Sequence, residues 1–386
     1  MTVPFQGGKL GPVEREKLQA VYNRFLANRE VYFGYPGNSL FDYQELYPFL
    51  QFPGNNCGDP FVPSNYQLQS HDLEREVLAD FMELTQTRNE DCWGYVTNGG
   101  TEGNLYGLFL GREVYPTGIV YYSEEAHYSV GKILRLLRLR SVAVRSLPKG
   151  EMDLEDLRHT LEVHRDTPTI FLVNIGTTMK GAIDNVAGIK SLAREMGIDK
   201  HYLHADAALS GMILPFVEKP PPWNFSAGID SIAISGHKFI GAPIPCGIVL
   251  AKREWISRMA RSVEYIGSID DTISGSRNAF SPLLLWYALR KAGKEGFRQW
   301  VRECFRLADY AIDRLRGLGK NAWRNEHSIT VVFDRPTEAI WKKWQIAVDH
   351  DIAHLVILPH VDTCRIDRLM EDLANDSLPV RQGEKL

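Results

Sequence analysis

The sequence lacks several features that mark whole classes of protein. Its 386 residues contain no basic block, and acidic and basic side chains are interspersed with a net charge of −4. This balance argues against a nucleic-acid partner or an anionic membrane surface. No apolar stretch approaches the roughly 20 residues of a membrane span, and residues 1–11 contain no apolar signal core. We therefore expect neither a membrane partner nor secretion.

Cysteine is also scarce. The five cysteines are widely spaced, odd in number and without any Cys-x-x-Cys pair. A disulfide framework needs an even set of paired residues, and a structural zinc site needs closely spaced ligands. We therefore expect reduced cysteines, a cytoplasmic location and no bound metal.

The chain is long enough for a large domain and a smaller one. Strand-like and helix-like segments alternate up to about residue 251, which predicts an α/β domain with a mostly parallel sheet. The pattern then changes to that of a small α+β domain. We expect an N-terminal segment over residues 1–55, a large domain over 56–275 and a small C-terminal domain over 276–386.

Hydrophobic periodicity outlines elements outside the predicted parallel sheet. It predicts a helix over residues 11–29. In the C-terminal region it predicts helices over 282–291, 295–315 and 337–348, and strands over 328–333 and 353–358.

Lys238 is the most informative residue of the chain. It ends the segment Ser-Gly-His-Lys, which follows the strand-like run 232–234. A lysine held at such a strand end tends to lose its proton and become a nucleophile toward carbonyls. Asp206 closes another apolar strand, over 202–205. A lysine that forms a Schiff base and a carboxylate that holds a pyridinium nitrogen are what pyridoxal phosphate (PLP) requires. On their own, the two residues fit a surface turn and a helix cap equally well.

Three further segments end predicted strands. The Gly-rich residues 97–104 follow the strand-like 93–96 and open a helix, which suits a phosphate. His127 follows another strand-like run, where it either stacks on a flat ring or has a structural role. Residues 176–178 (Gly-Thr-Thr) end a strand over 170–174, and their hydroxyls either reach a ligand or cap a turn. All these groups fall at carboxyl ends of strands, the edge at which open parallel sheets bind ligands.

The order of these motifs resembles the group II PLP-dependent amino-acid decarboxylases. It is most similar to the short bacterial histidine decarboxylases and the plant serine decarboxylases, and the resemblance runs from about Tyr32 to about Leu373. The segments that carry it are 99–104 (Gly-Gly-Thr-Glu-Gly-Asn), 127–129 (His-Tyr-Ser), 174–178 (Asn-Ile-Gly-Thr-Thr), 204–208 (His-Ala-Asp-Ala-Ala) and 235–238 (Ser-Gly-His-Lys).

The resemblance implies PLP fold type I and a role for each matching residue. Lys238 would hold the cofactor covalently and Asp206 would pair with its pyridine nitrogen. His127 would stack on one face of the ring and Ala208 would touch the other, while Thr177 would lie near the ring hydroxyl. The residues implied for the phosphate are Gly100, Thr101, Ser235 and His237.

We also expect an obligate homodimer whose active sites use both chains, because the segment before Asn55 is too short and too rich in helix-breaking residues to form its own domain. The resemblance adds a second ground, a loop that comes partly from the partner subunit. The segment 262–278 would form a loop over the site, in which Tyr265 would be catalytic together with Lys238, His127 and Asp206. Arg277, or Ser276 beside it, would reach the phosphate in the neighbouring subunit. The segment 1–55 would pack on the partner.

We expect the substrate to be a small polar L-amino acid, with histidine the first choice and serine the alternative. Tyr35, Asn38, His71 and Tyr265 are expected to line a polar pocket, which suits an imidazole or a hydroxyl. Residues 279–280 are Ala-Phe, whereas both groups of decarboxylases usually have Gly-His there. A more distant alternative is an aminotransferase-like enzyme, in which Arg324 would clamp the substrate carboxylate; release of CO2 rather than formation of a keto acid distinguishes the two.

Overall fold

A computed structural model describes residues 9–256, 262–263 and 268–376. Its central element is a seven-stranded sheet with the order β1-β7-β6-β5-β4-β2-β3. The strands from β6 through β5, β4 and β2 to β3 run parallel, whereas β7 runs antiparallel between β1 and β6. The mostly parallel α/β fold predicted from the sequence is confirmed. The strands are β1 (Cys92–Thr97), β2 (Ile119–Ser123), β3 (Arg140–Val144), β4 (Thr169–Asn174), β5 (His201–Asp206), β6 (Ser231–Ser235) and β7 (Gly247–Lys252).

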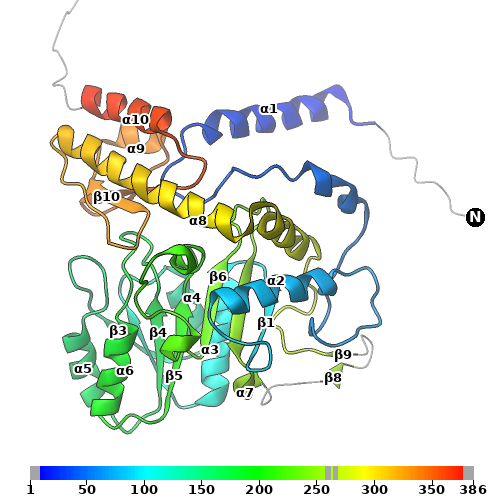
Figure 1. Ribbon diagram of the computed structural model, residues 1–386, viewed down its shortest axis with the longest axis vertical. Helices are drawn as coiled ribbons and strands as arrows, with labels where there is room; N and C mark the ends of the chain where they lie inside the picture. The colour runs from blue at the N-terminus through cyan, green and yellow to red at the C-terminus, as the bar shows by residue number, and fades with distance from the viewer. Residues whose placement is uncertain (1–8, 257–261, 264–267, 377–386) are drawn as a thin grey trace, which may run out of the picture.

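Helices cover both faces of this sheet (Figure 1). Alternate residues of one strand point to opposite faces. In β4, Ile170 and Leu172 pack in one apolar cluster, with α3 and α4, whereas Phe171 and Val173 pack in another, with α2, α5 and α6. Both faces are thus buried, which explains the continuous apolar runs of the inner strands. The helices are α2 (His71–Leu84), α3 (Gly100–Val114), α4 (Ser129–Leu136), α5 (Leu154–Glu162), α6 (Val186–Glu195) and α7 (Arg253–Ile256).

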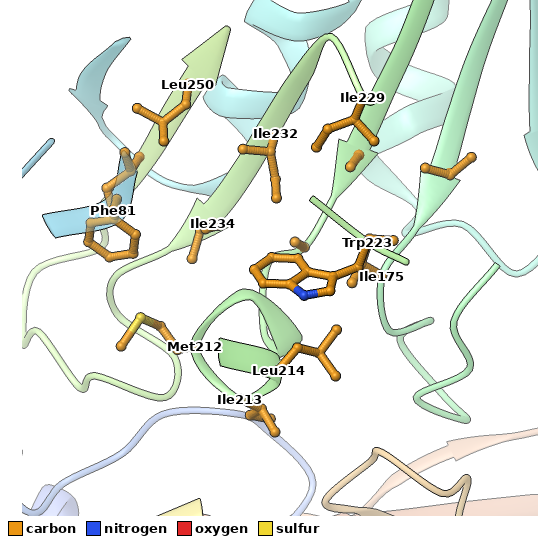
Figure 2. Close-up of a cluster of buried hydrophobic side chains, with 14 of the residues drawn as sticks. Phe81, Ile175, Met212, Ile213, Leu214, Trp223, Ile229, Ile232, Ile234 and Leu250 are labelled. Carbon is orange, nitrogen blue, oxygen red and sulfur yellow. The ribbon is translucent and has the colours of Figure 1, made fainter. Parts of the chain in front are cut away.

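The larger apolar cluster fills the space between the sheet and the segment that follows β5. Figure 2 shows the Trp223 ring lying among side chains of that segment, such as Leu214, and of β6, such as Ile232. Burial of these side chains fixes the carboxyl ends of β5 and β6 side by side. The short 3-10 helices of the chain are η1 (Gln44–Gln51), η2 (Ser210–Met212), η3 (Leu214–Phe216) and η4 (Phe225–Ala227).

A second apolar cluster lies in the C-terminal region. There α8 (Phe280–Gly317) and α10 (Thr363–Asp376) pack against a three-stranded antiparallel sheet. The backbone of α8 breaks at Gly293, which has a φ of +61°. This break separates the two helices predicted over 282–291 and 295–315. This sheet consists of β10 (Thr330–Asp334), β11 (Ala347–Asp349) and β12 (Ile352–Val356). A separate two-stranded sheet is formed by β8 (Ser262–Val263) and β9 (Ser268–Ile269).

The helix predicted over residues 337–348 is wrong in its second half. The helix α9 covers only Glu338–Lys343, and residues 347–349 form the strand β11. Gln345 adopts a φ of +47°, which a right-handed helix does not allow. Its side-chain amide donates to the carbonyl of Val31 at 3.2 Å, so a contact distant in sequence accompanies the turn.

The N-terminal segment divides into an exposed helix and a partly buried strap, residues 31–43. Phe33 packs in the second apolar cluster, and its carbonyl accepts a hydrogen bond from the backbone of Val356 at 2.8 Å. By contrast, α1 (Pro12–Arg29) contains no buried residue. The predicted domain boundaries, after residues 55 and 275, stay predictions. Within the described ranges, none of the helices is both long enough and apolar enough to span a bilayer.

Candidate active site

Lys238 lies just beyond the carboxyl end of β6. Burial lowers the pKa of its ammonium group, and the Asp206 carboxylate opposes that shift. The Lys238 carbonyl accepts a hydrogen bond from the Asn38 backbone at 3.1 Å, and the Asn38 side-chain amide donates to the carbonyl of Phe239 at 2.9 Å. The N-terminal strap therefore holds the turn that carries the lysine. A lowered pKa favours the neutral amine, which is the nucleophilic form.

Asp206 and His127 lie in the same cluster as Lys238. Burial lowers the pKa of His127, Lys238 lowers it further, and Asp206 acts in the opposite direction. The His127 ring is held through Nδ1, which is 2.8 Å from the Ser129 hydroxyl. Asp206 uses Oδ1 to accept the backbone N–H of Ala208 at 3.1 Å. The structure thus brings together a lysine, a carboxylate and an imidazole from the carboxyl ends of three parallel strands, β6, β5 and β2.

The first turn of α3 forms an anion-binding cradle beside this cluster. Its N-cap, Gly99, has a φ of +140° and no side-chain cap, so the first N–H groups of the helix are available. A Cβ atom on Gly100 would lie 2.6 Å from the Ser235 hydroxyl and 3.6 Å from the Cβ of Ala208. The Ser235 hydroxyl is buried without a hydrogen-bond partner among the described residues.

A PLP phosphate fits this cradle. It would accept from the orphaned Ser235 hydroxyl and from the free N–H groups of the helix, which favour negative charge. His237 lies at the same place: its Cε1 atom is 3.9 Å from where a Cβ of Gly99 would be, and its Nδ1 is 2.8 Å from the Cys246 carbonyl. Thr101 is exposed in the first turn of α3.

Thr177 begins a tight turn at the carboxyl end of β4. Its hydroxyl accepts the backbone N–H of Ala182 at 3.0 Å, and its carbonyl accepts that of Gly181 at 2.8 Å. The hydroxyl proton is left to donate. Gly176 has a φ of +107°, and a Cβ there would lie 2.3 Å from the Ser210 hydroxyl, so this turn requires glycine.

Arg277 lies in a different environment from the one expected. Its guanidinium is buried in an ion pair with Glu74 and donates to the carbonyl of Gly58 at 2.9 Å. The same carboxylate accepts the backbone N–H of Val96 at 2.8 Å. Arg277 thus ties the segment before α8 to α2 and β1 within the chain. Its role at the phosphate of the neighbouring subunit stays a prediction. Tyr265 lies outside the described residues.

Asn38, Tyr35 and His71, which were predicted to line a substrate pocket, each contact different neighbours within the chain. The side-chain amide of Asn38 is already bonded within the chain: Nδ2 donates to the Phe239 carbonyl, and Oδ1 accepts the N–H of Leu40 at 3.1 Å. Tyr35 is exposed and stacks on Tyr32. His71 is buried at the start of α2, and its Nε2 has no partner within the described part of the chain.

Two polar residues of the site were missed at the sequence level. Asn104, one turn into α3, donates from Nδ2 to the Asp206 Oδ2 at 2.6 Å, and its Oδ1 is 3.0 Å from the Nε2 of His204. His204 stands two residues before Asp206, so both side chains lie on the same face of β5. That spacing, and the place of Asn104 at the end of the Gly-rich motif, were the available signals. Among the described residues, no group of three or more His, Cys, Asp or Glu side chains gathers as metal ligands.

Comparison with known proteins agrees with this geometry. The pyridoxal-dependent decarboxylase conserved domain matches residues 72–335. The chain is 49% identical to a histidine decarboxylase of Pseudomonas entomophila over 373 residues, 96% of this chain and 93% of that protein. It is 47% identical to a histidine decarboxylase of Morganella morganii, over 94% of this chain and 97% of that one. The crystal structure of L-methionine decarboxylase from Streptomyces sp.590 with L-methionine methyl ester superimposes with a TM-score of 0.86 at 26% identity, covering 95% of each chain.

The chain therefore belongs to the pyridoxal-dependent decarboxylase family. Its fold is PLP fold type I, and it is a PLP-dependent amino-acid decarboxylase, as the sequence predicted. The aminotransferase-like alternative gains no support, and Arg324 forms an ion pair with Asp309 at 2.7 Å in the C-terminal region.

Proposed function

We propose that this protein decarboxylates L-histidine to histamine and CO2, with PLP as the cofactor. The observation that carries the proposal is the 49% identity, over 96% of the chain, to a protein named as a histidine decarboxylase. The site geometry is compatible with this chemistry, because it places a lysine of lowered pKa beside a carboxylate and an anion cradle.

The proposed cofactor contacts follow from the positions of the side chains. Lys238 holds PLP covalently and Asp206 holds its ring nitrogen, since a carboxylate there favours the protonated ring. When bound, PLP supplies an electron-accepting ring that takes up the electron pair left by departing CO2. By the family resemblance, His127 would contact one face of the ring, Ala208 the other, and Thr177 the ring hydroxyl. The phosphate is bound by Gly100, Thr101, Ser235 and His237.

Tyr265 stays a proposed catalytic residue of the loop over the site. A test is Tyr265→Phe, which removes only the hydroxyl. We expect kcat to fall while the cofactor remains bound, because cofactor binding uses other residues. An unchanged kcat would contradict the assignment.

Substrate preference is tested by incubating the PLP-loaded protein with single amino acids and measuring CO2, amine and keto acid. We expect histidine to give the highest kcat/KM, serine a lower value, and phenylalanine and leucine values lower by about 10⁴ or more. A site that hydrogen-bonds the substrate side chain leaves its own polar groups unpaired when that side chain is apolar. A higher kcat/KM for serine would replace the histidine assignment. Keto acid in place of CO2 would contradict the reaction itself.

A homodimer is the proposed assembly, and α1 is its main contact. Phe25 of α1 is 67% exposed and Leu18 is 60% exposed. Further exposed apolar side chains lie in η1, including Leu50. Large apolar side chains exposed in such numbers along one segment of a chain are typical of an interaction site. Figure 1 shows α1 running along the outside of the molecule, where a second copy of the chain would cover it.

Sedimentation equilibrium tests this assembly. We expect a dimer for the wild-type protein and a monomer for Phe25→Glu, because a charge would be buried without a partner at the interface. Val163→Glu is the matched control, since Val163 is 74% exposed at the end of α5, far along the chain from α1. A fully active wild-type monomer at working concentration would contradict the proposal.

We also propose that the enzyme acts in the cytoplasm. The cysteines support this location: all five lie in the described part of the chain and none is paired in a disulfide. The test is fractionation of the native cells, in which recovery of the protein outside the cytoplasmic fraction would contradict it.

A further inference from the structure

A line of buried hydrogen bonds runs away from Asp206 into the protein. Asn104 bridges Asp206 and His204. The Nδ1 of His204 lies 2.7 Å from the Ser231 hydroxyl, and the Tyr202 hydroxyl donates to the same oxygen at 2.7 Å. All five side chains are buried. The contacts join α3, β5 and β6, which are separate segments of the chain.

The direction of each bond follows from the chemistry of its groups. An ionised carboxylate only accepts, so Asn104 must turn its NH2 group to Asp206 and its oxygen to His204. That oxygen also only accepts, so the Nε2 of His204 must carry a proton. Burial lowers the pKa of His204 to about 4, which keeps the ring neutral at neutral pH. Its Nδ1 is then an acceptor.

The remaining two bonds are fixed in turn. Ser231 has one hydroxyl proton and must give it to the Nδ1 of His204. Its oxygen is left to accept, which matches the donation from Tyr202. Every proton in the line therefore points toward Asp206. In a region of low dielectric constant such a line strengthens each of its bonds, and a bond to an ionised acceptor is stronger than a neutral one.

The helix beside His204 is shaped to admit its ring. A Cβ on Gly107 would lie 2.1 Å from the Nδ1 of His204, so the ring lies where any larger residue of α3 would collide with it. Close packing of this kind fixes the ring plane, and with it the direction of the Nε2 proton. The position of His204 is therefore set by packing on one side and by hydrogen bonds at both nitrogens.

We propose that Asn104 and His204 are positioning residues, which hold the Asp206 carboxylate aimed at the cofactor's ring nitrogen. The proposal rests on the proposed pairing of Asp206 with that nitrogen. Neither residue touches the reacting atoms. Their effect passes through Asp206, because Oδ2 is occupied by Asn104 while Oδ1 keeps a lone pair beside its bond to Ala208.

The first experiment reads the protonation of the ring nitrogen directly. Protein is loaded with PLP labelled with ¹⁵N at that nitrogen, and its NMR shift is followed against pH. We expect Asn104→Leu and His204→Phe to lower the proton affinity of the nitrogen, and His204→Gln, which keeps a donor and an acceptor, to restore part of it. Turnover should fall about 10- to 100-fold in kcat with little change in KM, as when a group that orients a ligand-holding side chain is removed.

Two comparisons separate the possible failures. Tyr121→Phe removes a buried hydroxyl of β2 that has no partner among the described residues, and we expect no change in the nitrogen shift. Asp206→Asn, measured in parallel, should lower the nitrogen's proton affinity most. If it does not, the pairing with Asp206 fails. If Asp206→Asn does and the Asn104 and His204 variants do not, the positioning role alone is overturned.

The second experiment uses the wild-type protein without cofactor, so it does not depend on variants that fold. Histidine labelled with ¹⁵N in the ring gives separate signals for Nδ1 and Nε2. We expect His204 to be neutral, with its proton on Nε2, between pH 6 and 8. A proton on Nδ1 alone would reverse the direction of the line, and protons on both nitrogens would remove the acceptor of the Ser231 proton. Either result would overturn the proposal.

Discussion

The side chains at the carboxyl edge of the sheet and those of the helix α1 differ in burial and in their contacts within the chain. At the sheet edge, Asp206, Asn104 and His204 are buried and each has partners within the chain. In α1 no residue is buried, and large apolar side chains such as Phe25 face outward. The three named side chains at the sheet edge have their partners within one chain, whereas α1 is the surface that we propose a second copy of the chain covers. The predictions below test that contrast, beginning with the largest effect.

Removal of the Lys238 amine should have the largest effect. In Lys238→Ala we expect turnover to fall by on the order of 10⁴-fold or more, as when a covalent catalyst is deleted. The visible absorption of covalently held PLP should disappear after dialysis. The control is Lys342→Ala, which changes an exposed side chain of α9. This variant should keep both the turnover and the visible absorption. A borohydride-reducible band that survives in Lys238→Ala would mean that another lysine holds the cofactor.

Removal of the Asp206 charge should have the next largest effect. Asp206→Asn keeps the shape of the side chain and should leave PLP bound. We expect kcat to fall on the order of 10²- to 10³-fold, the range for loss of a fixed electrostatic contact in a site. Steady-state rates, measured with cofactor content determined on the same samples, check this. Near-normal turnover would mean that a different acid holds the ring nitrogen.

Acid should destabilise the sheet edge through His204. Burial lowers the pKa of His204 from 6.5 to about 4. Between these values the unfolded chain binds a proton that the folded chain does not, so the free energy of unfolding falls as the pH is lowered through this window. The full loss is about 3 kcal/mol, at 1.36 kcal/mol for each pH unit. Above pH 6.5 His204 is neutral in both states, and this loss of stability is absent.

Urea unfolding of the cofactor-free protein at pH 6.5 and at pH 4.5 measures this loss. His204→Gln has no titrating group at this position and is the comparison. We expect the wild-type protein to lose more stability than the variant between the two pH values. Equal losses in both proteins would show that the pKa of His204 is not lowered in the folded chain.

Substitution in α1 should have the smallest effect on a single chain. Phe25→Glu removes no contact buried within the chain, so we expect a change within about 0.5 kcal/mol in the dilute monomer. The wild-type melting temperature should rise with protein concentration, because association stabilises the folded state, whereas that of Phe25→Glu should not. Calorimetry over a range of concentrations checks this. A large destabilisation of the dilute variant would place Phe25 in a contact within the chain.

The sequence predicted most of the sheet edge because its signals are local. The strands that precede Lys238, Asp206, His127 and Thr177 are short apolar runs ended by glycine or polar residues, and each one is confirmed. The break between the two predicted helices around Gly293 is confirmed for the same reason. The ion pair of Arg277 with Glu74 was not predicted, since the two residues lie 203 positions apart and nothing local indicates the pair.

Sequence alone determined the fold class, the decarboxylase family and the residues proposed to hold the cofactor. Strand periodicity and glycine at turns are read within a few residues of one another, and the order of the motifs is read directly along the chain. Tertiary structure alone decided that β7 runs antiparallel between β1 and β6, that the helix after residue 337 ends before Gln345, and that Asn104 reaches Asp206 across 102 residues. These features depend on which distant segments pack together, and local propensity does not encode that choice.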